Sequence, residues 1–353
     1  MSKSKTRLIV GNAINDLETC RRLAERASEL KDDFDVRIDV GNLARKKSFE
    51  LTDPGDSYLE YSVKQSSLSD FAAPEPLRPF LNLDFVAENA ELLKRKSEIL
   101  EKHGLGASLT GHEPIYFREP VYEAFPHWRG PRVDHPRRSR NPIWAPCLIQ
   151  PEVRKLYHDL TAELLRLCPR LDTFNFLAND CATGFCWHVG LYPGPNGPEA
   201  CRSLGEGPHV AAFQKALIEA AASAGLTAQV YFRHMAGPDN RAMVRRYLPE
   251  GGFVLPADGP GGGVSIGSAL AGTYPVRYIE NPFGFLEALE GALTDERRAV
   301  FLSLTTPYNA ANSDDDSMAL TFEVLKRFCR KRTRSMAERV ALLTELASSR
   351  VGQ

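Results

Sequence analysis

Short apolar runs alternate with amphipathic stretches along most of this chain. A short apolar run bounded by turn residues predicts a buried strand, and apolar positions spaced three and four apart predict a helix. Strands are expected at residues 8–10, 34–40, 105–110, 172–178, 228–232, 252–255, 275–279 and 300–304. Helices are expected at residues 16–30, 84–103, 151–168, 209–224, 240–248 and 283–293, followed by a last helical region at 317–349.

This alternation is typical of parallel strands joined by helical crossovers. A closed barrel and an open doubly wound sheet both fit. The dinucleotide-binding open sheet carries several glycines after its first strand, but Val10-Gly11-Asn12-Ala13 holds only one. We therefore predict an α/β fold of the (β/α)8 TIM barrel type over roughly residues 5–330. It would lie in a single domain, 1–353, with a C-terminal helical extension over about 331–353.

Four segments between these elements are expected to be irregular. The polar stretch 46–79 is too long for a simple turn and is predicted to carry a small hairpin. Long loops are predicted after strands 3 and 4, up to about residues 150 and 207. The glycine-rich stretch 259–263 is expected to be a flexible loop, because no helix pattern and no phosphate-binding Lys-Ser/Thr follow it.

Charge and cysteine content narrow the classes of partner. The 353 residues include 44 basic and 45 acidic ones, so a chain-wide basic field for nucleic acid is absent. No secretory leader and no apolar run of about 18 residues is found, so we expect no membrane partner. Seven cysteines, an odd number, suggest a reducing, cytoplasmic setting. Cys186 and Cys201 are either free buried thiols or a disulfide pair.

Ionisable and amide residues follow five of the predicted strands. In TIM barrels the loops after the strands form the active face, so these residues are candidates for function. They are His112 and Glu113 after the third strand, Asn179 and Asp180 after the fourth, Arg233 and His234 after the fifth, Glu280 after the seventh and Tyr308 after the eighth.

Two carboxylates stand out because glycoside hydrolysis needs one acid to protonate the leaving oxygen and a second to attack the sugar or activate water. Asp180 and Glu280 follow strands four and seven, whose ends face each other across a barrel. We predict that Asp180 is the proton donor and Glu280 the nucleophile or base. The alternatives are a helix cap or loop anchor for Asp180 and a rim salt bridge for Glu280. Glu113 is a third candidate carboxylate.

Aromatic and arginine side chains gather in the two long loops. All three tryptophans, Trp128, Trp144 and Trp187, lie there, and flat rings suit the apolar faces of sugars. Six arginines between Arg118 and Arg140 could pair with an acidic or sulfated sugar, or could tether the loops through salt bridges. We predict a carbohydrate substrate bound by Arg118, Trp144 and Trp187 among others; the rings could instead form a small core for the loops themselves.

Metal, cofactor and serine-nucleophile chemistry lack a signature in the sequence. His112, Glu113, His127, His135, His188 and His234 could supply ligands, yet no HExxH spacing and no paired CxxC is present. A GxSxG motif is also absent. We therefore expect no metal and no cofactor.

The region after the fourth strand resembles the family 67 α-glucuronidases. The residues concerned are Phe176-Leu177-Ala178-Asn179-Asp180, Gly184-Phe185 and Tyr192-Pro193-Gly194-Pro195. More loosely, the order of elements resembles the barrel of hexosaminidase-like glycosidases. The Asn-acid pair after strand four and the Glu after strand seven are similar to the large retaining-glycosidase clan. The glucuronidases carry an acidic Glu where this chain has Ala182, so either Asp180 takes that role or the resemblance is one of architecture alone.

The predicted function is thus a glycoside hydrolase that acts on a sugar, an acidic one being a candidate. A non-catalytic carbohydrate-binding or assembly module on the same barrel is the main alternative. An aldolase or isomerase barrel ranks last, because the predicted strand ends carry no lysine.

Overall fold

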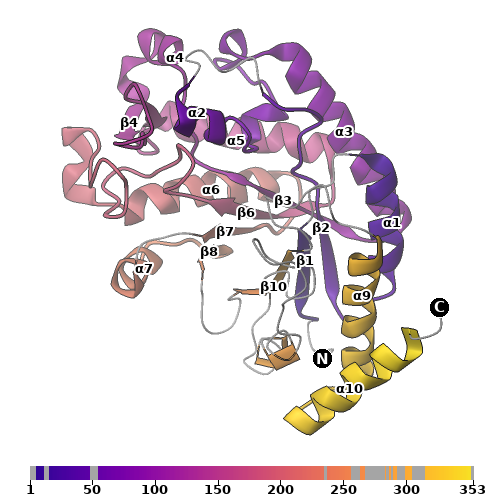
Figure 1. The fold of residues 1–353 in the computed structure, drawn as a ribbon. Helices are drawn as coiled ribbons and strands as arrows, with labels where there is room; N and C mark the ends of the chain where they lie inside the picture. Colours follow the sequence, from indigo (N-terminus) through magenta and orange to yellow (C-terminus); the bar gives the residue numbers. More distant parts are fainter. Residues whose placement is uncertain are drawn as a thin grey trace. The chain divides into compact units, whose positions relative to one another are not determined.

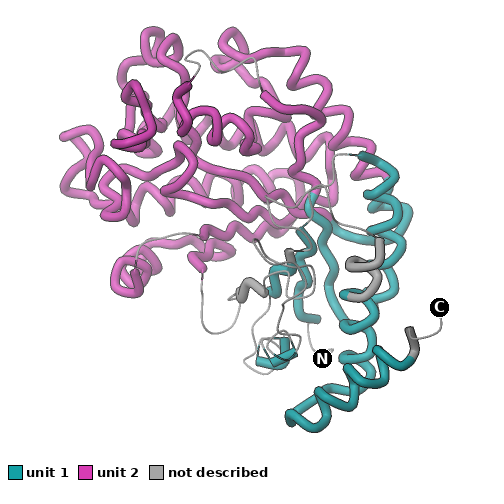
Figure 2. Tube along the Cα trace, in the orientation of Figure 1, with its two compact units in different colours: residues 1–39, 99–106, 256–353 teal, residues 40–98, 107–255 magenta. Residues whose placement is uncertain are grey.

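The computed structural model describes residues 5–11, 16–47, 55–233, 237–255, 263–266, 283, 286–287, 289–291, 299–303 and 315–350. The chain divides into two compact units (Figure 2): unit 1 comprises residues 1–39, 99–106 and 256–353, and unit 2 comprises residues 40–98 and 107–255. Figure 1 labels most of their helices and strands. All candidate site residues that the structure describes belong to unit 2.

Unit 1 is built on four parallel strands in the order β2-β1-β10-β9. The first strand follows from the apolar run Leu8–Val10, whose three side chains are buried. The helix after it begins where predicted, because Asp16 accepts a hydrogen bond from the backbone N–H of Thr19. The elements are β1 (Arg7–Gly11), α1 (Leu17–Ser28), β2 (Asp35–Asp39), β9 (Gly263–Ile266), β10 (Ala299–Ser303), α9 (Asp315–Arg330) and α10 (Met336–Arg350).

Unit 2 carries a second set of four parallel strands in the order β3-β6-β7-β8. Its main elements are β3 (Gly106–His112), α5 (Pro151–Leu167), β6 (Leu171–Leu177), α6 (Gly207–Ser223), β7 (Gln229–Arg233), α7 (Pro238–Arg245) and β8 (Gly252–Val254). The long helix α3 (Leu83–Lys102) has residues in both units. Shorter elements are α2 (Ser57–Ser62), η2 (Leu68–Asp70), η3 (Arg78–Phe80), α4 (Glu119–Ala124), η4 (Pro126–Trp128), β4 (Arg129–Arg132), β5 (Trp144–Pro146) and η5 (Glu199–Leu204).

The two faces of the β3-β6-β7 strands differ in chemistry. On one face Phe176 and Phe232 pack edge-on against Phe213 of α6, with ring centroids 5.6 and 5.3 Å from it. Since side chains alternate along a strand, Asn175 of β6 and Arg233 of β7 project from the opposite face. One face therefore holds the core, and the other presents polar groups.

The structure confirms the parallel α/β character of the prediction and corrects its loops. Residues 113–150, predicted as one long loop, contain α4 and the antiparallel pair β4–β5. The sequences of β4 (Arg-Gly-Pro-Arg) and β5 (Trp-Ala-Pro) do not predict strands, because proline and glycine are poor strand formers. These two strands form because they pair with each other. The described part of 46–79 forms short helices instead of the predicted hairpin.

One further prediction is corrected by the structure, and the others stay predictions. Strand β9 includes Gly263, which was assigned to a flexible loop. The predicted strand 275–279 and most of the predicted helix 283–293 lie outside the described residues. Closure of eight strands into a barrel and the single-domain organisation stay predictions. Within the described ranges, none of the helices is both long and apolar enough to cross a bilayer.

Candidate active site

Polar side chains from three neighbouring strands meet on one face of the unit 2 sheet. Thr110 of β3 is in register with Asn175 of β6, and Leu177 is in register with Arg233 of β7. The Arg233 Nε–H donates to Asn175 Oδ1 at 3.0 Å, and Asn175 Nδ2 donates to Thr110 Oγ1 at 3.4 Å. His112, two residues after Thr110, is half-buried at the end of β3. The predicted residues His112 and Arg233 thus both lie at carboxyl ends of parallel strands.

The turn after β6 holds Asp180 in an unusual backbone setting. Asn179, Cys181 and Ala182 adopt left-handed φ angles of 63°, 54° and 62°, a conformation that costs non-glycine residues about 1–2 kcal/mol each. The turn is stabilised by its own polar groups: Asp180 Oδ1 accepts from the Cys181 N–H at 2.7 Å, and Asn179 Oδ1 accepts from the Phe185 N–H at 3.2 Å. Strain of this kind concentrates at functional sites, where surrounding structure holds it in place.

Three rings and a guanidinium surround this turn; with Asp180 we call them the Asp180 cluster (Asp180, Tyr58, His135, Arg138, Tyr192). The rings of Tyr58, His135 and Tyr192 lie 4.4 to 6.0 Å apart, centroid to centroid. The Arg138 guanidinium lies 5.3 Å from the centroid of the Tyr58 ring. Tyr58 is buried beneath the turn and its hydroxyl accepts from the Ala182 N–H at 3.0 Å. Tyr192, His135 and Arg138 keep surface open to solvent.

The charge of Asp180 raises the pKa of neighbouring side chains. Burial first, and then the Asp180 carboxylate, raise the pKa of Tyr58. The same two causes raise the pKa of the Cys181 thiol to about 12. Tyr192 follows the same pattern, with its pKa raised by burial and by Asp180 and lowered in part by Arg138. Asp180 therefore lies within electrostatic reach of two tyrosine hydroxyls and a thiol.

Glu113 is enclosed within the protein, with 1% of its surface exposed. Its carboxylate accepts hydrogen bonds from the Leu68 N–H at 2.7 Å, the Ile115 N–H at 3.1 Å and the Tyr157 hydroxyl at 3.1 Å. Burial outweighs these bonds and raises the pKa of Glu113 to about 7. The structure gives Glu113 the role of an anchor between η2, the end of β3 and α5; its contact with a substrate stays a prediction.

The predicted sugar-binding side chains of the loops already have protein contacts. The exposed Arg118 donates from Nη2 to the carbonyl oxygen of Phe80 at 2.6 Å. The Trp144 ring lies under the guanidinium of Arg129, and the Trp187 ring under that of Arg202, at 5.3 and 5.5 Å. Both rings are half-buried. Substrate contacts by these three residues stay predictions.

Two arginines of the arginine-rich segment pair with acidic residues of the loops, and pairing of the segment with an acidic sugar stays a prediction. Arg129 pairs with Glu119, and Arg132 pairs with Asp134 at 2.8 Å, as expected of loop tethers. Arg138 instead stacks on Tyr58 and lies beside the Asp180 turn. Glu280, His234 and Tyr308 lie outside the described residues, so their places in the site stay predictions.

Sequence reasoning missed three members of the Asp180 cluster as partners of Asp180. Tyr58 comes from the polar stretch after β2. A hairpin is predicted there from the sequence, so the buried face of the helix α2 is not expected. His135 was considered only as a metal ligand, and Arg138 only as one of six arginines. A usable signal was the pair of tyrosines Tyr58 and Tyr61 within an otherwise polar segment.

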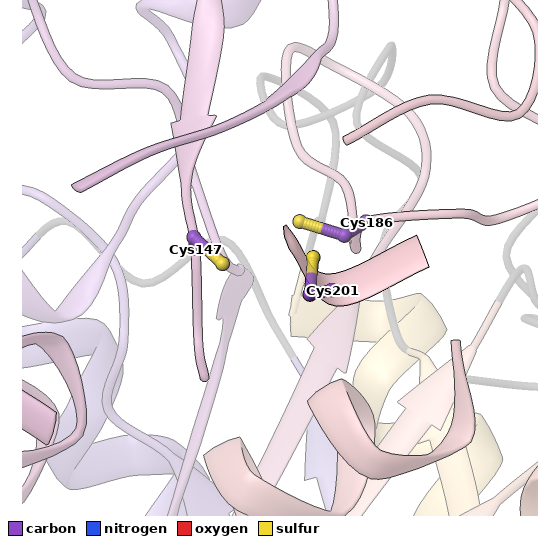
Figure 3. Close-up of side chains that lie close together, drawn as sticks. All are labelled: Cys147, Cys186 and Cys201. Carbon is purple, nitrogen blue, oxygen red and sulfur yellow. The ribbon is translucent and has the colours of Figure 1, made fainter. Parts of the chain in front are cut away.

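A second group of reactive side chains lies elsewhere in unit 2. The sulfur atoms of Cys147, Cys186 and Cys201 all lie within 4.8 Å of one another, and the three side chains are buried (Figure 3). All three are free thiols, so the disulfide considered for Cys186 and Cys201 is not formed in this structure. Within the part of the chain that the structure describes, these three side chains are grouped closely enough to hold a metal ion.

Compared with known proteins, this α/β fold is TIM-barrel-like and similar to glycoside hydrolases. It matches the solved structure of a GH138 enzyme targeting pectin rhamnogalacturonan II, with a TM-score of 0.52 and 11% sequence identity, over 95% of this chain and 40% of that one. Two further structures each give a TM-score of 0.48 and 11% identity over 97% of this chain. They are a β-N-acetylhexosaminidase, of which 75% is covered, and the GH20 exo-β-N-acetylglucosaminidase of Vibrio harveyi, of which 57% is covered.

The chain spans about two fifths of the length of the first matching structures. No protein-family model and no curated protein sequence matches it. The predicted resemblance to glycoside hydrolases is therefore confirmed for the fold, and the narrower resemblance to α-glucuronidases stays a prediction.

Proposed function

We propose that the protein is a glycoside hydrolase in which Asp180 donates a proton to the leaving oxygen and Glu280 supplies the second carboxylate. The observation that carries this proposal is the Asp180 cluster: a half-buried carboxylate after a parallel strand, on a strained turn, beside partly exposed rings. The carboxyl end of such strands is where TIM-barrel enzymes place catalytic groups. The likeness of the fold to a GH138 enzyme supports the same class of reaction.

The surroundings of Asp180 suit a sugar. Tyr192 is 48% exposed, and its ring contacts that of His135 at a tilt of 52°, so the Tyr192 ring offers an apolar face with a polar edge beside the carboxylate. Arg138, exposed over Tyr58, adds a positive charge that would pair with the carboxylate of a uronic acid. The proposed substrate is therefore a glycoside whose sugar carries an acidic group, bound across Tyr192 and Arg138.

A panel of aryl glycosides tests the proposal, with glucuronides, galacturonides, neutral hexosides and N-acetylhexosaminides compared on the wild type. We expect cleavage of at least one uronide, and a fall of about 10²- to 10⁴-fold in kcat/KM for both Asp180→Asn and Glu280→Gln, the contribution typical of acid–base groups. Asp159→Asn, a half-buried aspartate paired with Lys155 on α5, is the matched control and should keep wild-type activity.

The outcomes separate the alternatives. Cleavage that both carboxylate variants retain in full would contradict the residue assignment while supporting the enzyme class. Sugar binding in calorimetry without turnover, unchanged by Asp180→Asn, would instead identify a carbohydrate-binding module. Cleavage of neutral sugars alone, unaffected by Arg138→Ala, would contradict the acidic substrate.

A further inference from the structure

Three cysteines from separate segments of unit 2 converge on one buried point (Figure 3). Cys147 directly follows β5, Cys186 lies in the connection after β6, and Cys201 belongs to η5. In Figure 3 the sulfur of each side chain points toward the other two. Their exposed fractions are 1%, 1% and 4%, so the sulfur atoms make almost no contact with solvent.

A fourth potential ligand lies beside them. His209, in the first turns of α6, is fully buried, and neither of its ring nitrogens has a hydrogen-bond partner among the residues that the structure describes. Leaving a buried imidazole without a partner costs about 1–3 kcal/mol. The ring lies beside the thiol of Cys147, close enough to interact with it.

Three sulfurs and one imidazole nitrogen are the ligand set of a structural zinc site. Zinc–sulfur bonds of about 2.3 Å at tetrahedral angles put the sulfur atoms about 3.8 Å apart. Sulfurs already within 4.8 Å of one another need only a small contraction to reach that geometry. On binding, three thiol protons pass to solvent, and the three thiolates and the neutral imidazole leave a net charge of −1 with Zn²⁺.

The residues around the sulfurs suit this role. The Trp187 indole N–H donates to Cys201 Sγ at 3.3 Å, the kind of outer hydrogen bond that orients a metal-bound thiolate. Trp187 holds this position with a left-handed φ of 66°. Gly197 completes the packing, because a Cβ there would lie 2.8 Å from the Cys186 Cβ and 3.0 Å from the Trp187 nitrogen. Ile149 and Trp187 cover the cluster with apolar surface.

We infer that Cys147, Cys186, Cys201 and His209 bind one zinc-class divalent cation, which links the β4–β5 pair to the connection after β6 and to the start of α6. The ion would fasten the segment that carries both Asp180 and Trp187, so it serves as a structural site and takes no part in the chemistry of Asp180. This inference does not depend on the proposed function, because it concerns metal content and stability alone.

Metal analysis of the full-length chain, purified reduced and without chelators, tests the inference. We expect about one Zn²⁺ per chain in the wild type and less than about 0.1 in Cys186→Ser. Cys168→Ser, which replaces a buried cysteine outside the cluster, is the matched control and should keep the full equivalent. His209→Ala should retain the thiolates but weaken the affinity at least about tenfold.

Titration of the reduced wild type with Co²⁺ keeps the test informative if a cysteine variant fails to fold. A tetrahedral site with three thiolates should give intense d–d absorption and a thiolate-to-cobalt charge-transfer band, saturating at one Co²⁺ per chain. Three outcomes would overturn the inference: no stoichiometric uptake of Zn²⁺ or Co²⁺, equal uptake by Cys186→Ser, or a Cys186–Cys201 disulfide in the freshly purified, unreduced protein.

Discussion

At the scale of single residues, the acidic side chains of Asp180 and Glu113 have opposite surroundings. Asp180 lies half-buried on a turn where one oxygen accepts from a backbone N–H. Glu113 is fully enclosed, and three donors surround its carboxylate. A carboxylate open to solvent on one side can meet a substrate, whereas an enclosed one holds segments together. Glu113 therefore holds segments together, and Asp180 is the residue for which we propose a chemical role.

Glu113 gives a prediction about the pH dependence of stability. Its pKa rises from 4.5 to about 7 on folding, so the folded chain keeps a proton that the unfolded chain releases between these values. The stabilisation is complete below about pH 4.5 and is lost as the pH rises through about 7. The difference between the two pKa values corresponds to about 3 kcal/mol of unfolding free energy.

Urea unfolding of Glu113→Gln at pH 5 and pH 8 measures this contribution. The wild type loses stability between pH 5 and pH 8 as Glu113 ionises, whereas glutamine cannot ionise. The unfolding free energy of Glu113→Gln minus that of the wild type should therefore rise by about 2–3 kcal/mol from pH 5 to pH 8. Glu123→Gln, at an exposed position of α4, should follow the wild type at both pH values. A constant difference between Glu113→Gln and wild type across this range would show that Glu113 titrates as an ordinary carboxylate.

At the scale of elements, the site depends on short segments that pack by backbone contact. Gly130 of β4 faces the backbone of β5, and a Cβ there would lie 2.6 Å from the Ala145 carbonyl oxygen and 2.8 Å from the Cys147 nitrogen. The Cys147 N–H also donates to the Trp128 carbonyl oxygen at 2.8 Å. Glycine at position 130 therefore permits the close pairing that positions Cys147.

Gly130→Ala should destabilise the fold by about 1–3 kcal/mol, the usual cost of overpacking, because the contacts are with backbone atoms that cannot rotate away. Urea unfolding monitored by tryptophan fluorescence provides the measurement, since Trp128 and Trp144 flank this pair. Gly11→Ala is the control: the nearest atom that a Cβ there would meet among the described residues is Leu302 O at 3.7 Å, so its effect should be within about 0.5 kcal/mol. Equal stabilities for both variants would contradict the packing argument.

The elements also show how far the sequence could predict this structure. Strands β6 and β7 are apolar runs with clear turn signals, and Gly104 ends the helix before β3 in a left-handed conformation, so local signals sufficed there. The β4–β5 pair has no such signal because its strands exist only through each other. The Asp180 cluster joins residues 58, 135, 138, 180 and 192, and only tertiary packing brings segments so distant together.

At the scale of the whole molecule, the fold is similar to that of glycoside hydrolases at low sequence identity. The GH138 enzyme has a TM-score of 0.52 and 11% identity, so the similarity concerns the arrangement of the backbone and does not extend to individual side chains. A fold of this class supports many chemistries, and the activity must be argued from the site. The proposed activity therefore depends on Asp180, whose place after a parallel strand could be predicted from the sequence, whereas its aromatic and arginine neighbours could be found only in the structure.

The most direct test is the dependence of Asp180→Asn on the leaving group of a cleaved aryl glycoside. A proton donor matters most when the leaving oxygen is basic. Asp180→Asn should therefore lower kcat/KM at least about 10²-fold on the phenyl glycoside, and less than about tenfold on the dinitrophenyl glycoside of the same sugar. Equal losses on the two substrates, or no loss on either, would contradict the assignment of Asp180 as the acid.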